Sequence, residues 1–209
     1  MSQSKNDNEI NMFKELFIKD QTYKDVIKKI EVWQDLESAY SGKLKIKRTR
    51  TDHLITLVLN VPYKDQEIIL TESDTKPLKF EVELQLNTEF EFVLGPEDSI
   101  ERILKVFGKQ DVMIGNTGFD KKYMIQSSNP ELVKRVLHPR SINQGILEHK
   151  LSSISLQNRK KAGLSKLLLV KDRNTKSREV ISSIIQLICT IIDSMDKNQI
   201  INRNYELQQ

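Results

Sequence analysis

The chain has 209 residues, a formal net charge of +4, 30% charged and 38% hydrophobic residues. This balance is typical of a folded soluble protein and excludes a disordered or fibrous chain. No apolar run approaches the ~20 residues of a membrane-spanning helix, and the N-terminus lacks the apolar core of a secretory signal. The single cysteine, Cys189, cannot form an internal disulfide and suits a reducing compartment, so we expect a cytoplasmic protein.

Residues 1–41 are predicted to form an N-terminal helical extension, because apolar side chains recur at three- and four-residue spacing. The first part of the extension carries a candidate interaction stripe, Met12, Phe13, Leu16 and Phe17. A stripe of this kind can bind a membrane surface, but only Lys14 and Lys19 flank it, which leaves little to attract anionic lipid. We therefore expect it to pack on its own domain, on a second copy of the chain or on another protein.

Residues 42–197 are predicted to form one α+β domain that begins with strands. Leu78 to Leu86 alternates cleanly with polar residues, and Lys43 to Lys47 alternates with its lysines outward. Leu54 to Val61 is apolar on both parities, which predicts a central strand covered on both faces. Shorter strands are expected at Glu67–Leu70 and Phe90–Leu94.

The segment from Gln110 to Leu137 carries the clearest local signals. Gly115-Asn116-Thr117-Gly118 follows a short apolar run, and the tetrad is predicted to be the turn of a hairpin whose second strand reaches Ile125. Ser128 or Asn129 can then cap a helix that has Pro130 in its first turn. Because the glycines precede a strand and not a helix, the hairpin is favoured over a phosphate-binding loop.

The remaining pattern predicts further helices and strands. Helices are expected from Pro96 to Phe107, from Ser141 onward, and from Thr175 to Lys197, the last one strongly apolar. Strands are expected at Leu151–Leu156 and Leu164–Val170, and residues 198–209 form a polar tail. Short turns between most strands predict a mainly antiparallel sheet with helices packed on one face.

Several short motifs occur along the predicted elements, and they resemble a broad set of uncharacterised prokaryotic domains. The motifs are Trp33-x-x-Leu36-Glu37, Gly115-Asn116-x-x-Phe119-Asp120-x-x-Tyr123-x-Ile125 and Leu132-x-x-x-Val136-Leu137, followed by the closing apolar helix. The resemblance spans about residues 30–197. In many of those domains a similar glycine and Phe-Asp segment precedes a strand and a helix, often behind transmembrane segments that this chain lacks. The resemblance implies a similar fold, and it carries no known catalytic residues.

Reactive side chains do not gather in any recognised pattern. The three histidines, His53, His138 and His149, lack the short spacings of a zinc site, and Cys189 stands among isoleucines as a buried small hydrophobe would. No nucleophile has a partner base at a known spacing. The sequence therefore predicts no catalytic residue, cofactor or metal. A site assembled only by the fold, for example from Asp111, Asp120, Tyr123 and Arg140, is the remaining enzymatic or ligand-binding alternative.

Basic side chains are concentrated in two segments, residues 43–50 and 159–178, and they support a second hypothesis. The candidate residues for binding nucleic acid or another polyanion are Lys43, Lys45, Lys47, Arg48, Arg159, Lys160 and Lys161. Neither segment contains an aromatic residue that could stack on a base, which disfavours single-stranded nucleic acid. The leading hypothesis is therefore a non-catalytic module that acts through protein contacts, including contacts with a second copy of itself.

Overall fold

The computed structural model describes residues 21–48, 55–73, 75–96, 112–159, 163–172, 175 and 177–203. Within these ranges the elements, in chain order, are α2 (Gln21–Ala39), β1 (Lys43–Arg48), β2 (Ile55–Tyr63), β3 (Gln66–Ser73), β4 (Lys76–Leu84), β5 (Phe92–Gly95), α4 (Thr117–Asp120), β6 (Met124–Ser127), α5 (Pro130–Leu137), α6 (Arg140–His149), β7 (Ser153–Arg159), β8 (Leu164–Lys171) and α7 (Arg178–Lys197). The mixture of helices with an antiparallel sheet confirms the predicted α+β class.

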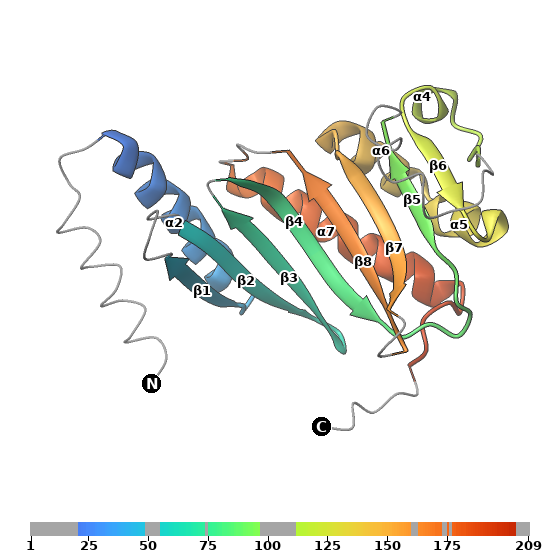
Figure 1. The fold of residues 1–209 in the computed structure, drawn as a ribbon, viewed down its shortest axis with the longest axis horizontal. Helices are drawn as coiled ribbons and strands as arrows, with labels where there is room; N and C mark the ends of the chain where they lie inside the picture. The colour runs from blue at the N-terminus through green and yellow to red at the C-terminus, as the bar shows by residue number, and fades with distance from the viewer. Residues whose placement is uncertain are drawn as a thin grey trace.

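The strands form one eight-stranded sheet in the order β1-β2-β3-β4-β8-β7-β5-β6, which Figure 1 shows as a twisted layer running across the molecule. Every strand pair is antiparallel. The first four strands are neighbours in sequence and in space, whereas β8 is inserted beside β4 and brings the C-terminal half of the chain into the same sheet. The two halves of the sequence therefore share one continuous core.

One row of apolar side chains crosses all eight strands on the face that we call the inner face. Residues directly opposite in antiparallel strands point to the same side of the sheet. The successive partners are Leu44, Leu59, Leu70, Phe80, Leu169, Ile154, Leu94 and Ile125, and each is at most 4% exposed. At roughly 2 kcal/mol per fully buried large aliphatic side chain, this row alone is a major source of stability.

The long helices cover the inner face. Helix α7 contacts α2, α5 and α6, so these four helices belong to one layer, and in Figure 1 α7 crosses behind β4, β8 and β7. Helix α2 packs on β1 and β2 and buries Trp33 and Leu36 completely. Among the described residues, no helix is both long and apolar enough to cross a membrane.

The predicted hairpin around Gly115 is wrong. Residues 112–116 form no strand with β6, and Phe119 lies in the short helix α4. Asn116 starts this helix by accepting a hydrogen bond from the Phe119 amide at 3.3 Å, and the Phe119 and Tyr123 rings stack with 5.2 Å between their centroids. A helical turn therefore replaces the first part of the expected second strand, and only Met124–Ser127 pairs in the sheet. The predicted cap of the next helix is confirmed at Asn129, which accepts from the Leu132 amide.

The prediction that Leu54–Val61 forms a central strand covered on both faces is also wrong. Strand β2 lies next to the edge strand β1, and its side chains alternate between buried and half-buried along most of its length. The second set of apolar residues in this strand is therefore on a face that the described helices do not cover. The helix expected from Pro96 to Phe107 lies almost entirely outside the described residues.

Candidate functional site on the outer face of the sheet

The outer face is the side of the sheet opposite the helix layer. Two rows of side chains cross it in direct register. The first row runs through Lys43, Asn60, Ile69, Glu81, Leu168, Ser155, Val93 and Gln126. The second row runs through Lys45, Val58, Thr71, Lys79, Val170 and Ser153.

Burial changes along these rows. Val93, Gln126 and Ser155, at the β5–β6–β7 end, are buried, whereas the residues on β2, β3, β4 and β8 are half-buried and the lysines of β1 are exposed. The half-buried part includes four aliphatic side chains, Val58, Ile69, Leu168 and Val170. We call this set the aliphatic patch; none of the described helices lies over it.

Two acidic side chains of β4 on the outer face are neutralised by neighbours in the sheet. Glu81 pairs with Lys166 at 2.7 Å and Glu83 pairs with Arg159 at 2.6 Å. These pairs lie beside Leu168 and link β4 to β8 and, across β8, to β7. Their charges are satisfied within the sheet, so they leave little attraction for a charged ligand.

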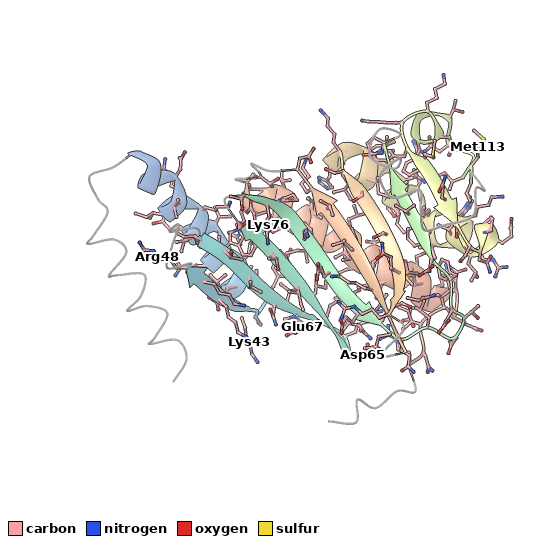
Figure 2. All side chains as sticks on the ribbon, viewed as in Figure 1. Lys43, Arg48, Asp65, Glu67, Lys76 and Met113 are labelled. Carbon is pink, nitrogen blue, oxygen red and sulfur yellow. The ribbon has the colours of Figure 1, made fainter. Side chains whose placement is uncertain are left out.

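Strand β1 presents the opposite situation. Its outward side chains Lys43, Lys45 and Lys47, which we call the lysine row, have no ion-pair partner among the described residues. Alternate residues of a strand are about 6.7 Å apart, so adjacent charges of the row repel by roughly 0.6 kcal/mol even in water. Figure 2 shows Lys43 and Arg48 at this end of the sheet, far from Met113 beside β6. The lysine row is therefore an uncompensated positive edge next to the aliphatic patch.

The structure places the described parts of the two predicted basic segments on the same outer face, but far apart along it. Lys43–Arg48 is β1, whereas Arg159 ends β7 and is already paired with Glu83. Five strand spacings of about 4.8 Å separate β1 from β7, roughly 24 Å. Lys160 and Lys161 lie outside the described residues, as do the interaction stripe Met12, Phe13, Leu16 and Phe17.

Two of the four residues considered for an enzymatic site, Asp120 and Tyr123, have structural partners, whereas Arg140 is exposed at the start of α6. Both oxygens of the Asp120 carboxylate accept backbone amides, from Ile114 and from Gly115, each at 3.0 Å. The Tyr123 hydroxyl donates to the carbonyl oxygen of Leu151 at 3.0 Å, and burial raises its pKa. Asp111 lies outside the described residues. Asp120 and Tyr123 therefore hold the α4 loop in place, and they also line a shallow hollow of about 270 Å³ together with Lys121 and Lys122.

A polar cluster joins the β2–β3 turn to the C-terminal part of α7, and we call it the hairpin clamp. The Tyr63 hydroxyl and the Lys64 ammonium both donate to Asp193 Oδ1, at 2.8 Å and 2.6 Å. Arg203 pairs with Asp65 and with Asp196 at the same end of the molecule. Burial raises the pKa of the Asp193 carboxyl, but the hydrogen bonds from Lys64 and Tyr63 outweigh burial, and the pKa lies below its usual value. Each charge in the clamp has a partner, which indicates a structural role.

A shallow groove of about 390 Å³ separates the α5–α6 corner from the end of α7. Arg135, His138 and Lys197 surround it together with Asp193. Helices α5 and α7 end here, and Arg135 and Lys197 offset their negative dipole ends, whereas α6 begins here after Pro139 and contributes a positive end. Asp193 is neutralised by Lys64. The groove is therefore mildly basic and shallow.

Thiol and metal chemistry have little support. Burial raises the pKa of the Cys189 thiol to about 11, with the nearby Asp193 carboxylate adding to the effect, so the thiolate that reacts is scarce at neutral pH. Among the described residues, no three His, Cys, Asp or Glu side chains gather closely enough to hold a metal ion. His53 lies outside the described residues.

The aliphatic patch was not predicted as a functional surface. Its signal was the apolar content on both parities of Leu54–Val61, repeated in Leu164–Val170. That pattern indicates apolar side chains on two faces of a strand, but it does not show whether another element covers the second face. The register of β2, β3 and β8 was needed to place these side chains together.

The fold is a single antiparallel sheet backed by helices, and a solved structure of another protein has a similar fold. Neither a family model nor a curated protein matches the chain. The crystal structure of the mycobacterial trehalose monomycolate transport factor A, TtfA, is similar, with a TM-score of 0.51 over 78% of this chain and 91% of that chain. The two sequences are 10% identical, so the likeness is one of fold.

Proposed function

We propose that this protein is a non-catalytic module that binds another protein through the outer face of β1, β2, β3, β4 and β8. The observation that carries the proposal is the aliphatic patch, which is half-buried on a face that the described helices leave uncovered. Apolar side chains grouped on a flat surface with a polar rim are typical of protein interaction sites.

The shape of the face favours a protein over a small molecule. Small-molecule sites are concave and enclose most of the ligand, whereas this face is the surface of a sheet. Five strands of six to nine residues cover on the order of 500–700 Å² in projection. This area is close to the ~800 Å² that each partner contributes to a standard interface.

The charge of the face favours a different protein over a second copy. Lys43, Lys45, Lys47 and Lys79 lack ion-pair partners within the described residues, and Glu67 is the one outward acid of these five strands that is also unpaired there. Two copies stacked on this face would bring like charges together, and like charges across an interface are strongly unfavourable. A partner with an acidic surface avoids this repulsion.

The proposal also concerns the compartment. A lone cysteine whose thiol pKa is raised by burial needs no oxidising environment, and we place the interaction in the cytoplasm. Fractionation of cells that produce the protein tests this placement; recovery outside the cytoplasmic fraction would contradict it.

A photo-crosslinking amino acid introduced into the full chain tests the interaction. Ile69 and Leu168 are the probe positions, and Gln186, exposed on the opposite side in α7, is the matched control. In cells that express the protein natively, we expect Ile69 and Leu168 to give the same discrete adduct and Gln186 to lack it. Equal adducts from all three positions, an absence of adducts, or an adduct with the mass of two copies would each contradict the proposal.

A further inference from the structure

The lysine row specifies the partner's chemistry more closely than the aliphatic patch does. Its three ammonium groups project from alternate positions of one strand, Lys43, Lys45 and Lys47, and all are exposed. Their partners across the sheet are the neutral side chains Asn60, Val58 and Thr56, so β2 offers them no carboxylate. The row is thus a straight line of positive charge bordered by a neutral strand.

We infer that the lysine row binds an acidic segment of the partner protein in extended conformation, with carboxylates at alternate residues. The inference rests on the proposed function, because the segment lies at the rim of the same outer face. Alternate residues of an extended chain repeat at about 6.7 Å, which is the spacing of the lysines themselves. Three carboxylates can therefore meet three ammonium groups in register.

An acidic helix fits the row less well. Residues four apart in a helix rise by about 6.0 Å, but each such step turns the side chain by about 40° around the helix axis. By the third carboxylate the direction has changed by about 80°, so the carboxylates fan out around the helix, whereas alternate side chains of an extended segment stay on one side. The straight row therefore selects an extended segment over a helical one.

The surroundings of the row also favour a protein segment over a nucleic acid. Sequence-independent binding of single strands combines basic groups with aromatic side chains on which bases stack. The outward residues of β1, β2, β3, β4 and β8 include no aromatic side chain. Thr56, Val58 and Asn60 can instead accommodate the small side chains and backbone of a polypeptide.

Fluorescence anisotropy with synthetic peptides tests the inference on the full-length protein. The probe is a fluorescein-labelled peptide of nine residues. It has glutamate at positions 3, 5 and 7 and threonine at the other positions. The comparison peptide has the same composition with its glutamates at positions 1, 5 and 9, and a labelled oligothymidylate reports on nucleic acid. We expect the alternating peptide to bind at least several-fold more tightly than either, with affinity that falls as salt increases.

Three variants locate the binding. Reversal of the row by Lys43→Glu, Lys45→Glu and Lys47→Glu should weaken the alternating peptide at least tenfold, whereas the corresponding arginine variant should retain it. The charge-matched control reverses Lys28, Lys121 and Lys122, which are exposed elsewhere, and should bind as the wild type does. Unchanged thermal denaturation of the reversal variant shows that it folds.

The outcomes separate this inference from the proposed function. Equal loss in the reversal and control variants, equal binding of both peptides, tighter binding of oligothymidylate, or no peptide binding would overturn the acidic-segment inference. The reversal variant is also crosslinked at Ile69: loss of the adduct supports the inference, and an undiminished adduct overturns it while the interaction through the outer face stands. If the protein with its natural lysines gives no adduct from the probe at Ile69, the proposed function itself is overturned.

Discussion

Lys29 of α2 forms an ion pair with Glu72 of β3, with 2.9 Å between Nζ and Oε1, and the Glu72 side chain is only 2% exposed. The pair joins the helix to the inner face of the sheet, close to the fully buried Trp33, which follows Lys29 by one helical turn. Burying a carboxylate is unfavourable unless a cation and hydrogen bonds compensate it. The position of α2 on the sheet therefore depends on a polar contact as well as on apolar packing.

Replacing Lys29 by methionine tests this dependence. Removing the cation takes the Lys29 ion pair away from the buried Glu72 carboxylate, and the free energy of unfolding should fall by about 3 kcal/mol. The expected loss is at the lower end for a buried ion pair because Lys29 itself is 23% exposed. Urea denaturation gives the value. Lys28→Met, on the exposed side of the same helix, should change stability by less than about 0.5 kcal/mol, and the double variant Lys29→Met with Glu72→Leu should recover most of the loss. Equal effects of Lys28→Met and Lys29→Met would contradict the assignment.

The Asp120 carboxylate fixes the loop before α4 by accepting the amides of Ile114 and Gly115. Asp120→Ala should destabilise the protein by about 1–3 kcal/mol, because two amides lose their acceptor. The stability of Asp120→Asn should lie between those of the wild type and Asp120→Ala, because asparagine keeps one acceptor oxygen. Thermal denaturation measures the series, with Lys121→Ala as the control on the neighbouring exposed residue. If Asp120→Ala melts with the wild type, the carboxylate is not a structural group and its role in a site must be reconsidered.

The same loop shows why part of the fold could not be predicted from the sequence. Phe119 and Tyr123 are four residues apart, and residues at this interval lie on the same face of a strand and also on the same face of a helix. The glycines on either side of Asn116 favoured the strand interpretation, whereas the hydrogen bonds of Asn116 and Asp120 favour the helical turn. Long alternation, as in β4, and a strong cap, as at Asn129, carry no such ambiguity and were predicted correctly.

The outer face could not be predicted for a different reason. The lysines of β1 and their outward direction follow from alternation, but their relation to Ile69 and Leu168 depends on the order in which the strands pair. Strand β8 is beside β4 although about 80 residues separate them in the sequence. Local periodicity does not encode a pairing of that kind, so the aliphatic patch emerged only with the sheet.

Gly42 between α2 and β1 is required by a close approach of the backbone. A Cβ atom there would lie 2.8 Å from the Asn60 carbonyl oxygen and 2.9 Å from Leu59 Cδ1. Gly42→Ala should therefore lower the free energy of unfolding by about 1–3 kcal/mol, as overpacking does. Gly118→Ala is the matched control, because the nearest atom to its Cβ would be 3.6 Å away and alanine is favoured in a helix. Chemical denaturation of both variants decides: a Gly42→Ala protein as stable as Gly118→Ala would contradict the contact.

The hairpin clamp should make stability depend on pH through Asp193. Its pKa lies below the ordinary value of 3.8 because the hydrogen bonds from Lys64 and Tyr63 outweigh burial, so it stabilises the folded state above that value and the contribution is lost as pH falls through the folded pKa. The pKa of Lys64 is raised above 10.5, chiefly by its hydrogen bond to Asp193, so the same contact is also lost as pH rises through the folded pKa of Lys64.

Compared with the wild type, Asp193→Asn should be less stable at neutral pH, and the difference should shrink below about pH 4 and above about pH 10.5. Urea unfolding across the pH range measures it, with Asp35→Asn, at an exposed position in α2 away from the clamp, as the matched control. A deficit of Asp193→Asn that is the same at acidic, neutral and alkaline pH would show that the clamp does not act through these charges.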